Sequence, residues 1–164
     1  LKEARKGGAK ILHIDPYSNE TSRFADESWQ VVVGTDAALA LAIGGEILRA
    51  GHEDTEYLAA HANDLSDYKA ACAEWPVERA AEFCGVAADK IRELADAIGR
   101  EKATFIKVGY GMSRNEGGGN AIRAITLLHP TRWRGHCRTL ATTTCATLLL
   151  RFASLQGRFG LLPG

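Results

Sequence analysis

"KILHIDPYSNET", residues 10–21, runs from five strand-like residues into an acid, a proline and a polar turn. Lys10 to Ile14 are mostly apolar and include two β-branched isoleucines, which favours a buried strand. Pro16 has no N–H to donate, so strand pairing has to stop there. A proline also holds the preceding residue extended, which places the Asp15 carboxylate beyond the strand. The stretch therefore predicts a strand that presents an acid at its carboxyl end.

Two interpretations of Asp15 are equally supported by these residues. In open α/β sheets, ligands bind at the carboxyl ends of strands, and an acid there commonly accepts hydrogen bonds from ribose hydroxyls. An aspartate ahead of a polar turn also commonly opens an Asx turn, in which its side chain bonds the backbone two residues on. The sequence leaves both interpretations open.

A second strand is predicted at Trp29–Val33, and Gly34 ends it. Thr35 is a typical N-cap for the helix that follows, and Asp36 lies in the first turn, where the helix dipole favours negative charge. A carboxylate there could also accept the N1–H and N2 amine donors of guanine. From the residues alone, the dipole interpretation of Asp36 is favoured.

The central part of the chain is predicted to be helical. Residues 37–48 are apolar on nearly all sides, which indicates a buried helix, and Gly44-Gly45 within it indicates close approach of another backbone. Residues 52–99 predict a helical insertion, in which Pro76 begins one helix and Gly85 ends it. We expect these helices to serve packing.

The α/β pattern returns in "KATFIKVGYGMSRNEGGGNAIRAITLL", with a strand at 103–108, a loop at 109–119 and a helix at 120–128. The loop holds five glycines, which is typical of places where backbone amides approach phosphate. It is not a G-x-G-x-x-G fingerprint, because Arg114 stands at the third glycine's place. A flexible surface connection explains this loop as well as a ligand-binding one.

The 164 residues are 46% hydrophobic and 24% charged, with a formal net charge of zero. Residues 1–116 carry 14 Lys and Arg against all 20 acids, whereas residues 117–164 carry six Arg and no acid. An acidic body is not typical of a nucleic-acid binder. The four cysteines form no C-x-x-C pair, so no metal site is expected within the chain. We expect neither a signal peptide nor a membrane span.

Residues 129–164 have no acid and no lysine, and their apolar periodicity is poor. A basic arm for nucleic acid is one interpretation, and a poorly packed tail is another. The favoured interpretation is a segment that does not continue the upstream domain. The opening residues are typical of a helix end, because Arg5 and Lys6 precede Gly7-Gly8, so we expect a piece of a longer protein.

An enzyme needs a nucleophile, a base or a metal in a defensible arrangement. His13 lies within the first strand, which favours a core or edge histidine. No H-E-x-x-H or G-x-S-x-G motif is present. The sequence therefore predicts a ligand-holding domain, and we assign it no catalytic residue.

Four stretches come in an order and spacing that together resemble the molybdopterin oxidoreductases of the dimethyl-sulfoxide-reductase family, which include formate dehydrogenases and nitrate and thiosulfate reductases. They are "IDPYSNETSRFAD" at 14–26, "VVVGTDAALALAIGGEIL" at 31–48, "PVERAAEFCGVAADKIRELA" at 76–95 and "KVGYGMSRNEGGGNAIRAITLL" at 107–128. The resemblance covers residues 4–128, and the series of four is more specific than any one of them.

The resemblance implies a set of cofactor-binding residues. The family holds molybdenum or tungsten between two molybdopterin guanine dinucleotides. The strand end and turn at Asp15, Pro16, Tyr17 and Thr21 would line the guanosine of one dinucleotide. Gly34, Thr35 and Asp36 match the family's P-G-T-D turn, in which the acid reads guanine. Gly109, Tyr110, Gly111 and Arg114 match a loop that, in the family, contacts the cofactor near its metal end.

The resemblance also implies what lies outside the chain. The iron–sulfur cluster cysteines and the protein ligand to the metal would precede Leu1, and the expected partners are the remaining domains or electron-transfer subunits. The sequence departs from the family at Val33, where proline is usual, at Ser18, where arginine is frequent, and after Leu128. Substrate and compartment, cytoplasmic or periplasmic, stay open.

We therefore expect an α/β fold with three αβα layers, a small mostly parallel sheet and a helical insertion at 52–99, forming part of a larger domain. Residues 1–128 would be the dinucleotide-binding region, and residues 129–164 an atypical basic tail. Two alternatives are a stand-alone nucleotide-binding module without catalysis and a non-functional folded fragment. A homo-oligomer would cover an exposed sheet edge.

Overall fold

The structure is a computed structural model that describes residues 1–61, 65–101, 104–128, 140–141 and 146–151. Strands lie at both ends of a run of helices, so the predicted α/β class is confirmed. In chain order the elements are α1 (Lys2–Lys6), β1 (Ala9–Asp15), β2 (Glu27–Gln30), α2 (Asp36–Arg49), α3 (Thr55–His61), α4 (Leu65–Ala73), α5 (Val77–Cys84), α6 (Ala88–Arg100), β3 (Thr104–Val108), the 3-10 helix η1 (Met112–Arg114), α7 (Gly118–Leu127), β4 (Leu140–Ala141) and β5 (Ala146–Arg151).

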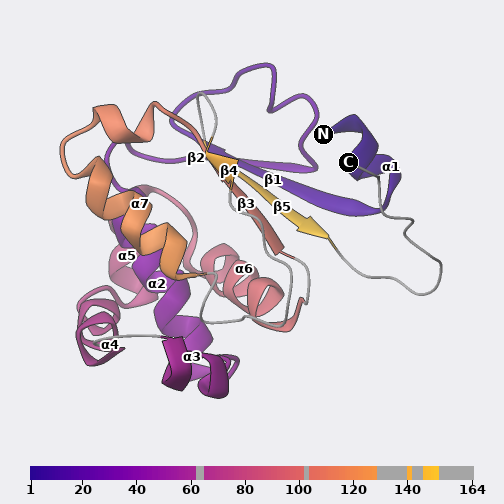
Figure 1. The fold of residues 1–164 in the computed structure, drawn as a ribbon. Helices are drawn as coiled ribbons and strands as arrows, with labels where there is room; N and C mark the ends of the chain where they lie inside the picture. The colour runs from indigo at the N-terminus through magenta and orange to yellow at the C-terminus, as the bar shows by residue number, and fades with distance from the viewer. Residues whose placement is uncertain (62–64, 102–103, 129–139, 142–145, 152–164) are drawn as a thin grey trace.

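The five strands form one sheet in the order β2-β1-β5-β3-β4 (Figure 1). β1 pairs in parallel with β2, and β3 pairs in parallel with β4, as predicted for a mostly parallel sheet. β5 inserts between β1 and β3 and is antiparallel to both, which the sequence did not predict. Because β1 and β3 both oppose β5, they run in the same direction. The carboxyl ends of β1, β2 and β3 therefore meet at one edge of the sheet.

The second strand is shorter than predicted and begins earlier. It was expected at Trp29–Val33, but it spans Glu27–Gln30. The Val32 N–H leaves the sheet and donates to the Cys84 carbonyl at 3.1 Å, and the Val32 carbonyl then accepts from the Thr35 N–H. The Val32 and Val33 side chains are consequently 56% and 63% exposed. The consecutive valines at 31–33 predicted a strand because β-branched residues favour strands, although Val32 and Val33 lie at the surface.

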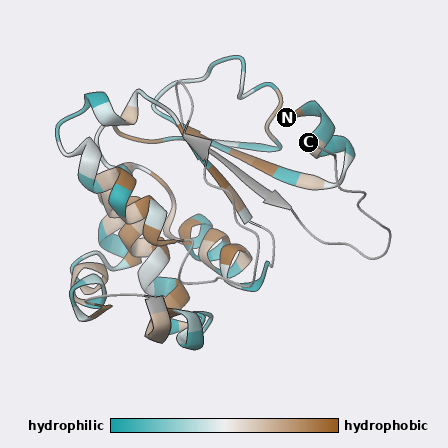
Figure 2. Ribbon diagram, in the orientation of Figure 1, coloured by the Kyte–Doolittle hydropathy of each residue, from teal (hydrophilic) through white to brown (hydrophobic). Residues whose placement is uncertain are grey.

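The helices from α2 to α7 gather on one side of the sheet in Figure 1, and α1 lies apart from them beside the start of β1. α2 is the central helix and contacts α4, α5, α6 and α7. The predicted insertion at 52–99 is helical and supplies α3 to α6. Figure 2 shows the apolar residues concentrated along α2, α6 and α7. One core cluster joins these helices to β1 and β3 through Leu12, Ile47, Ile91, Ile106 and Ile125.

The prediction that another backbone approaches closely at Gly44-Gly45 holds at Gly45, where a Cβ would lie 3.6 Å from the Cys72 carbonyl oxygen, whereas Gly44 faces side chains. A Cβ built on Gly44 would lie 2.0 Å from the Tyr68 hydroxyl oxygen and 3.5 Å from the Cys72 Sγ. Both side chains belong to α4, so a ring and a thiol occupy the space next to Gly44. The glycine is therefore needed where the buried Tyr68 side chain crosses the helix.

Most of residues 129–164 lie outside the described part of the chain. Within this range the structure describes β4 and β5. The predicted division at Leu128 therefore stays a prediction. Among the described residues, none of the helices combines the length and the apolarity needed to span a bilayer.

Candidate functional site

Three connections come together at the shared carboxyl edge of β1, β2 and β3. Residues 16–26 follow β1, residues 31–35 follow β2, and residues 109–117 follow β3. In Figure 1 this edge is the upper left end of the sheet. Every predicted cofactor-binding residue lies at the end of one of these strands, in one of these connections, or at the start of α2. The topology thus gathers sequence segments that are up to about 90 residues apart.

Asp15 is the last residue of β1, and its carboxylate is held by the turn that follows. Its Oδ1 accepts the Tyr17 N–H at 3.1 Å, which is an Asx turn, and its Oδ2 accepts the Asn19 side-chain amide at 3.0 Å. The residue is only 5% exposed. The turn-opening interpretation of Asp15 is therefore confirmed, whereas the ribose contact stays a prediction.

His13 lies beneath the same turn and is fully buried. Its Nδ1 is 3.1 Å from the hydroxyl oxygens of both Ser22 and Ser28, and its Nε2 is 3.7 Å from Asp15 Oδ2. Burial lowers the pKa of His13, and the nearby Asp15 carboxylate opposes this shift to a smaller extent. The ring is therefore neutral at neutral pH and ties β1, β2 and the 16–26 loop together, as expected of a core histidine.

The rest of the 16–26 loop is a set of tight turns. The Thr21 N–H donates to the Asn19 Oδ1 at 2.8 Å, and the Thr21 carbonyl accepts from the Phe24 and Ala25 N–H groups. Thr21 is half-buried, whereas Pro16 and Tyr17 are exposed and point out of the fold. The loop returns to β2 through Asp26, whose carboxylate accepts the Ile11 N–H at 2.9 Å.

The turn before α2 holds the other predicted acid. Gly34 has φ +83°, a conformation that favours glycine. Thr35 is the N-cap residue as predicted, but its hydroxyl donates to the Val32 carbonyl at 2.7 Å instead of accepting from the helix. Asp36 is half-buried and lines a small apolar cavity of about 50 Å³ with Ile14 and other core side chains.

Asp15 and Asp36 lie close enough to repel each other. Burial raises the pKa of the Asp36 carboxyl, its own backbone N–H lowers it, and the charge on Asp15 raises it further. The charge of Asp15 at the end of β1 therefore acts on the Asp36 carboxyl at the start of α2. A carboxyl group with a perturbed pKa at the edge of a sheet is a candidate ligand-site residue.

The glycine-rich loop is ordered into a short helix and a sharp turn. Gly109 is buried, Tyr110 is 56% exposed, and Gly111 begins η1 with an ordinary φ of −56°. A Cβ at Gly111 would meet no heavy atom within 4 Å. Arg114 at the end of η1 is exposed and makes no ion pair with any residue that the structure describes. The loop offers open backbone and a free cation at the shared edge.

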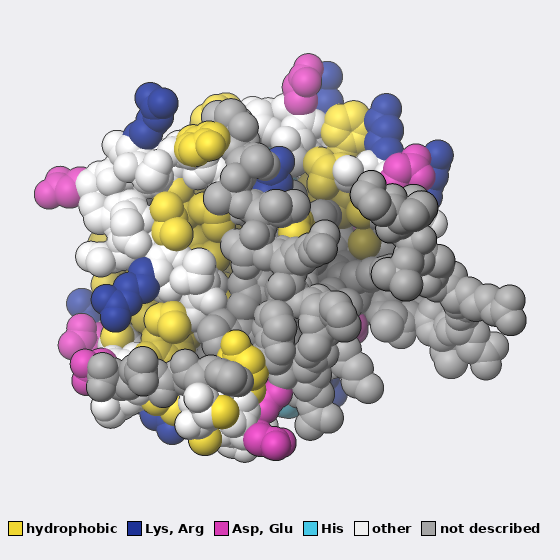
Figure 3. Space-filling model, viewed as in Figure 1, with side chains coloured by type: hydrophobic (Ala, Val, Ile, Leu, Met, Phe, Trp, Pro, Cys, Tyr) yellow, Lys and Arg dark blue, Asp and Glu magenta, His cyan; other side chains and the backbone are white. Residues whose placement is uncertain are grey.

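Charges on the described surface are dispersed. On the face shown in Figure 3, Lys and Arg side chains alternate with Asp and Glu and form no continuous basic patch. Within the described residues, no group of three or more His, Cys, Asp or Glu side chains is placed to hold a metal ion. The described residues at the shared edge therefore offer hydrogen-bonding groups and separate charged side chains, and no group of side chains placed to hold a metal ion.

The pH dependence of stability can test the environment of Asp36. Its folded-state pKa is raised, so the folded protein binds this proton more tightly, and ionisation of Asp36 removes stability as the pH rises above the unfolded value. We expect Asp36→Asn to have a higher urea midpoint than the wild type at pH 7, and the difference to vanish near pH 3. Asp67→Asn, at an exposed position on α4, is the control. Equal midpoints at pH 7 would contradict the assignment.

The fold and this edge define the chain as an α/β portion of a larger enzyme, and comparisons with known proteins agree. The chain is 32% identical over 127 residues to the probable oxidoreductase YoaE of Bacillus subtilis, which covers 77% of this chain and 19% of that protein. It is 33% identical over 150 residues to dimethyl sulfoxide reductase DmsA and 29% over 125 residues to formate dehydrogenase H, both of Escherichia coli. These alignments cover 78% and 76% of this chain and 18% of each relative.

A solved structure shows the same fold. Acetylene hydratase from Pelobacter acetylenicus superposes with a TM-score of 0.70 and 27% identity, over 80% of this chain and 18% of that one. No family model matches the chain. Its relatives are molybdopterin enzymes of the dimethyl-sulfoxide-reductase family, and the chain spans about a fifth of their length. The resemblance noted in the sequence is confirmed.

Proposed function

We propose that this chain is the guanine-dinucleotide-binding part of a molybdenum or tungsten oxidoreductase that performs two-electron redox chemistry on a small substrate. The observation that carries the proposal is the convergence of Asp15 and Asp36 at one sheet edge, where the charge on Asp15 contributes to the raised pKa of Asp36. Asp15 would bond the ribose hydroxyls, and Asp36 would accept the two donors of guanine. The membership of its relatives in a molybdopterin family supports the identity of the nucleotide.

The remaining edge residues fit an extended ligand. Pro16, Tyr17 and Thr21 would border the guanosine, and Gly34 and Thr35 would shape the turn that presents Asp36. Gly111 has an ordinary φ and open space where a Cβ would stand, so the fold itself does not require a glycine there. A bound molecule that approaches this backbone would require it. The residues of this loop that would border the pterin end of the ligand are Gly109, Tyr110, Gly111 and Arg114.

The proposed cofactor, when bound, supplies the redox chemistry, and the residues of this chain bind and orient it. No residue here is assigned a catalytic role. The metal ligand, any iron–sulfur cluster and the domain that would cover the opposite side of the cofactor belong to the remaining domains or subunits of the parent enzyme, which are the proposed partners. A homo-oligomer is a second way to cover the exposed surfaces.

Binding of guanine nucleotides tests the proposal. We expect calorimetry to show that the 164-residue chain binds GDP in preference to ADP. Asp36→Asn should weaken GDP binding about 10- to 100-fold and leave ADP binding unchanged, because the amide replaces one acceptor with a donor that faces the donors of guanine. Asp67→Asn is again the control. Equal affinities for GDP and ADP would contradict the role of Asp36.

Two outcomes would favour the alternatives. Binding of guanine nucleotides without molybdenum in the full-length gene product, after anaerobic expression with molybdate, would favour a stand-alone nucleotide-binding module. Absence of nucleotide binding by both the chain and the full-length product would favour a folded fragment without function. Molybdenum and guanine nucleotide found together by elemental and nucleotide analysis would support the proposed function.

A further inference from the structure

Lys107 on β3 is a cation that no sequence motif singles out. It is half-buried and makes no ion pair with any described residue, unlike Lys90, which binds Glu27 at 2.6 Å. The residues on either side of it, Ile106 and Val108, belong to the core cluster beneath the helices. Since side chains alternate along a strand, Lys107 lies on the face of the sheet away from that core.

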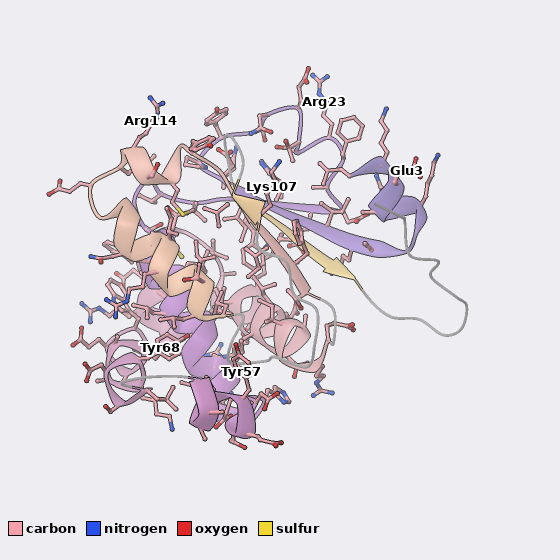
Figure 4. The ribbon with its side chains drawn as sticks, in the orientation of Figure 1. Glu3, Arg23, Tyr57, Tyr68, Lys107 and Arg114 are labelled. Carbon is pink, nitrogen blue, oxygen red and sulfur yellow. The ribbon has the colours of Figure 1, made fainter. Side chains whose placement is uncertain are left out.

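The strand register places Lys107 on the same face as His13 and Asp15. His13 of β1 and Lys107 of β3 both pair with residue 147 of β5, so the three positions form one row across the sheet. Residues in one row share a face. The Cα atoms of His13 and Lys107 are two strand spacings apart, roughly 10 Å, and Asp15 lies about 7 Å farther toward the carboxyl edge. In the view of Figure 4, Lys107 lies near the upper end of the sheet, lower than Arg23 and Arg114 and above Tyr57 and Tyr68.

A cation at this edge would offset the negative charges of Asp15, Asp36 and a bound diphosphate. Asp15 and Asp36 already repel each other, and a nucleoside diphosphate would bring further negative charge to the same place. Ser18, in the turn after Asp15, offers only a hydroxyl, which accepts from the Gln30 side chain at 3.5 Å. Lys107 is a half-buried residue without a carboxylate partner among the described residues, and a cation near the protein surface is screened less by water where it is partly buried.

We infer that Lys107 binds the diphosphate of a guanine nucleotide whose ribose lies at Asp15. The inference rests on the proposed function and adds a residue to it. Lys107 is then a binding residue for the phosphate charge alone, separate from Asp36, which reads the base. The nucleotide would run from the turn before α2, across the end of β1, toward the end of β3.

A pair of ligands that differ only in phosphate isolates this role. Calorimetry on the 164-residue chain with GDP and with guanosine measures the phosphate contribution directly. Lys107→Met is expected to weaken GDP binding about 10- to 100-fold and to leave guanosine binding unchanged, and it should flatten the salt dependence of GDP affinity. Lys107→Arg should keep most of the affinity. Lys69→Met, at an exposed lysine on α4 that also lacks an ion pair among the described residues, is the matched control.

The outcomes separate this inference from the proposed function. If GDP binds and Lys107→Met binds it equally well, Lys107 has no phosphate role and the proposed function stands. If Arg114→Met loses the GDP-specific affinity and Lys107→Met does not, the cation is Arg114 and the inference is wrong. If the wild type binds neither GDP nor guanosine, both the inference and the guanine site are overturned. Equal urea midpoints for Lys107→Met and the wild type confirm that the variant is folded.

Discussion

Gly118→Ala is expected to lower the free energy of unfolding by about 3 kcal/mol or more, because its new methyl group would collide with backbone. A Cβ built on Gly118 lies 1.9 Å from the Met112 carbonyl oxygen and 3.1 Å from the Ser113 Cα. Backbone atoms cannot rotate away as a flexible side chain can, so η1 and the start of α7 would have to separate. The Gly118 N–H, which donates to the Asn115 carbonyl at 3.0 Å, would be displaced with them.

The neighbouring glycine is a matched control. A Cβ on Gly119, also in the first turn of α7, meets nothing within 4 Å. Gly119→Ala should therefore stabilise the chain by up to about 1 kcal/mol through helix propensity. Urea unfolding followed by circular dichroism measures both variants, with an unchanged slope showing that the comparison is valid. A Gly118→Ala midpoint equal to that of Gly119→Ala would show that the loop opens at no cost and does not hold the fixed shape described.

Local patterns in the sequence predicted the elements whose structure depends on near neighbours. The strand through Ile14, the stop at Pro16 and the helix after Thr35 follow from β-branching, a missing N–H and capping preferences. The left-handed Gly85 at the end of α5, with φ 76°, likewise follows from its position after an amphipathic run. In each case the physical cause lies within a few residues of the element itself.

The parts that the sequence did not predict depend on contacts between distant segments. The position of β5 between β1 and β3 depends on pairing with segments about 40 and 140 residues away in the sequence. No local pattern in the sequence specifies such distant partners, so this position was not predicted. The register that places Lys107 in the row of His13 follows from that insertion. The prediction of strand at Val32 and Val33 was wrong for the same reason. The hydrogen bond that takes Val32 out of the sheet is made to Cys84, which lies on a different element.

The site shows the same division. The resemblance to a family pointed to both Asp15 and Asp36, but the effect of the Asp15 charge on Asp36 depends on the parallel pairing of β1 with β2, which brings the two residues together. The contacts of the buried His13 with Ser22 in the 16–26 loop and with Ser28 on β2 have no sequence signature, since serines are common and mostly exposed. Residues that position a site from beneath are therefore found from the structure rather than from the chain.

Gly44→Ala is expected to destabilise the fold by about 2 to 4 kcal/mol, and removal of the Tyr68 hydroxyl group should restore part of the lost free energy of unfolding. The new methyl group would lie 2.0 Å from the Tyr68 hydroxyl oxygen and 3.0 Å from its Cζ, inside the contact between α2 and α4. The hydroxyl is buried beside the Cys72 thiol, a weak partner, with no oxygen or nitrogen partner among the described residues, and burial raises the pKa of Tyr68. Tyr68→Phe alone should therefore be neutral or slightly stabilising.

The double variant Gly44→Ala with Tyr68→Phe is the decisive comparison, because phenylalanine removes the closest contact and leaves the ring. We expect it to unfold at a higher urea concentration than Gly44→Ala, with a coupling energy of about 1 to 2 kcal/mol. Gly45→Ala is the control, since its Cβ would lie at an ordinary 3.5 Å from the Cys72 Cβ. Additive effects of the two substitutions would mean that Tyr68 does not occupy the space beside Gly44. The α2–α4 contact, which supports the helix carrying Asp36, would then have to be built by other side chains.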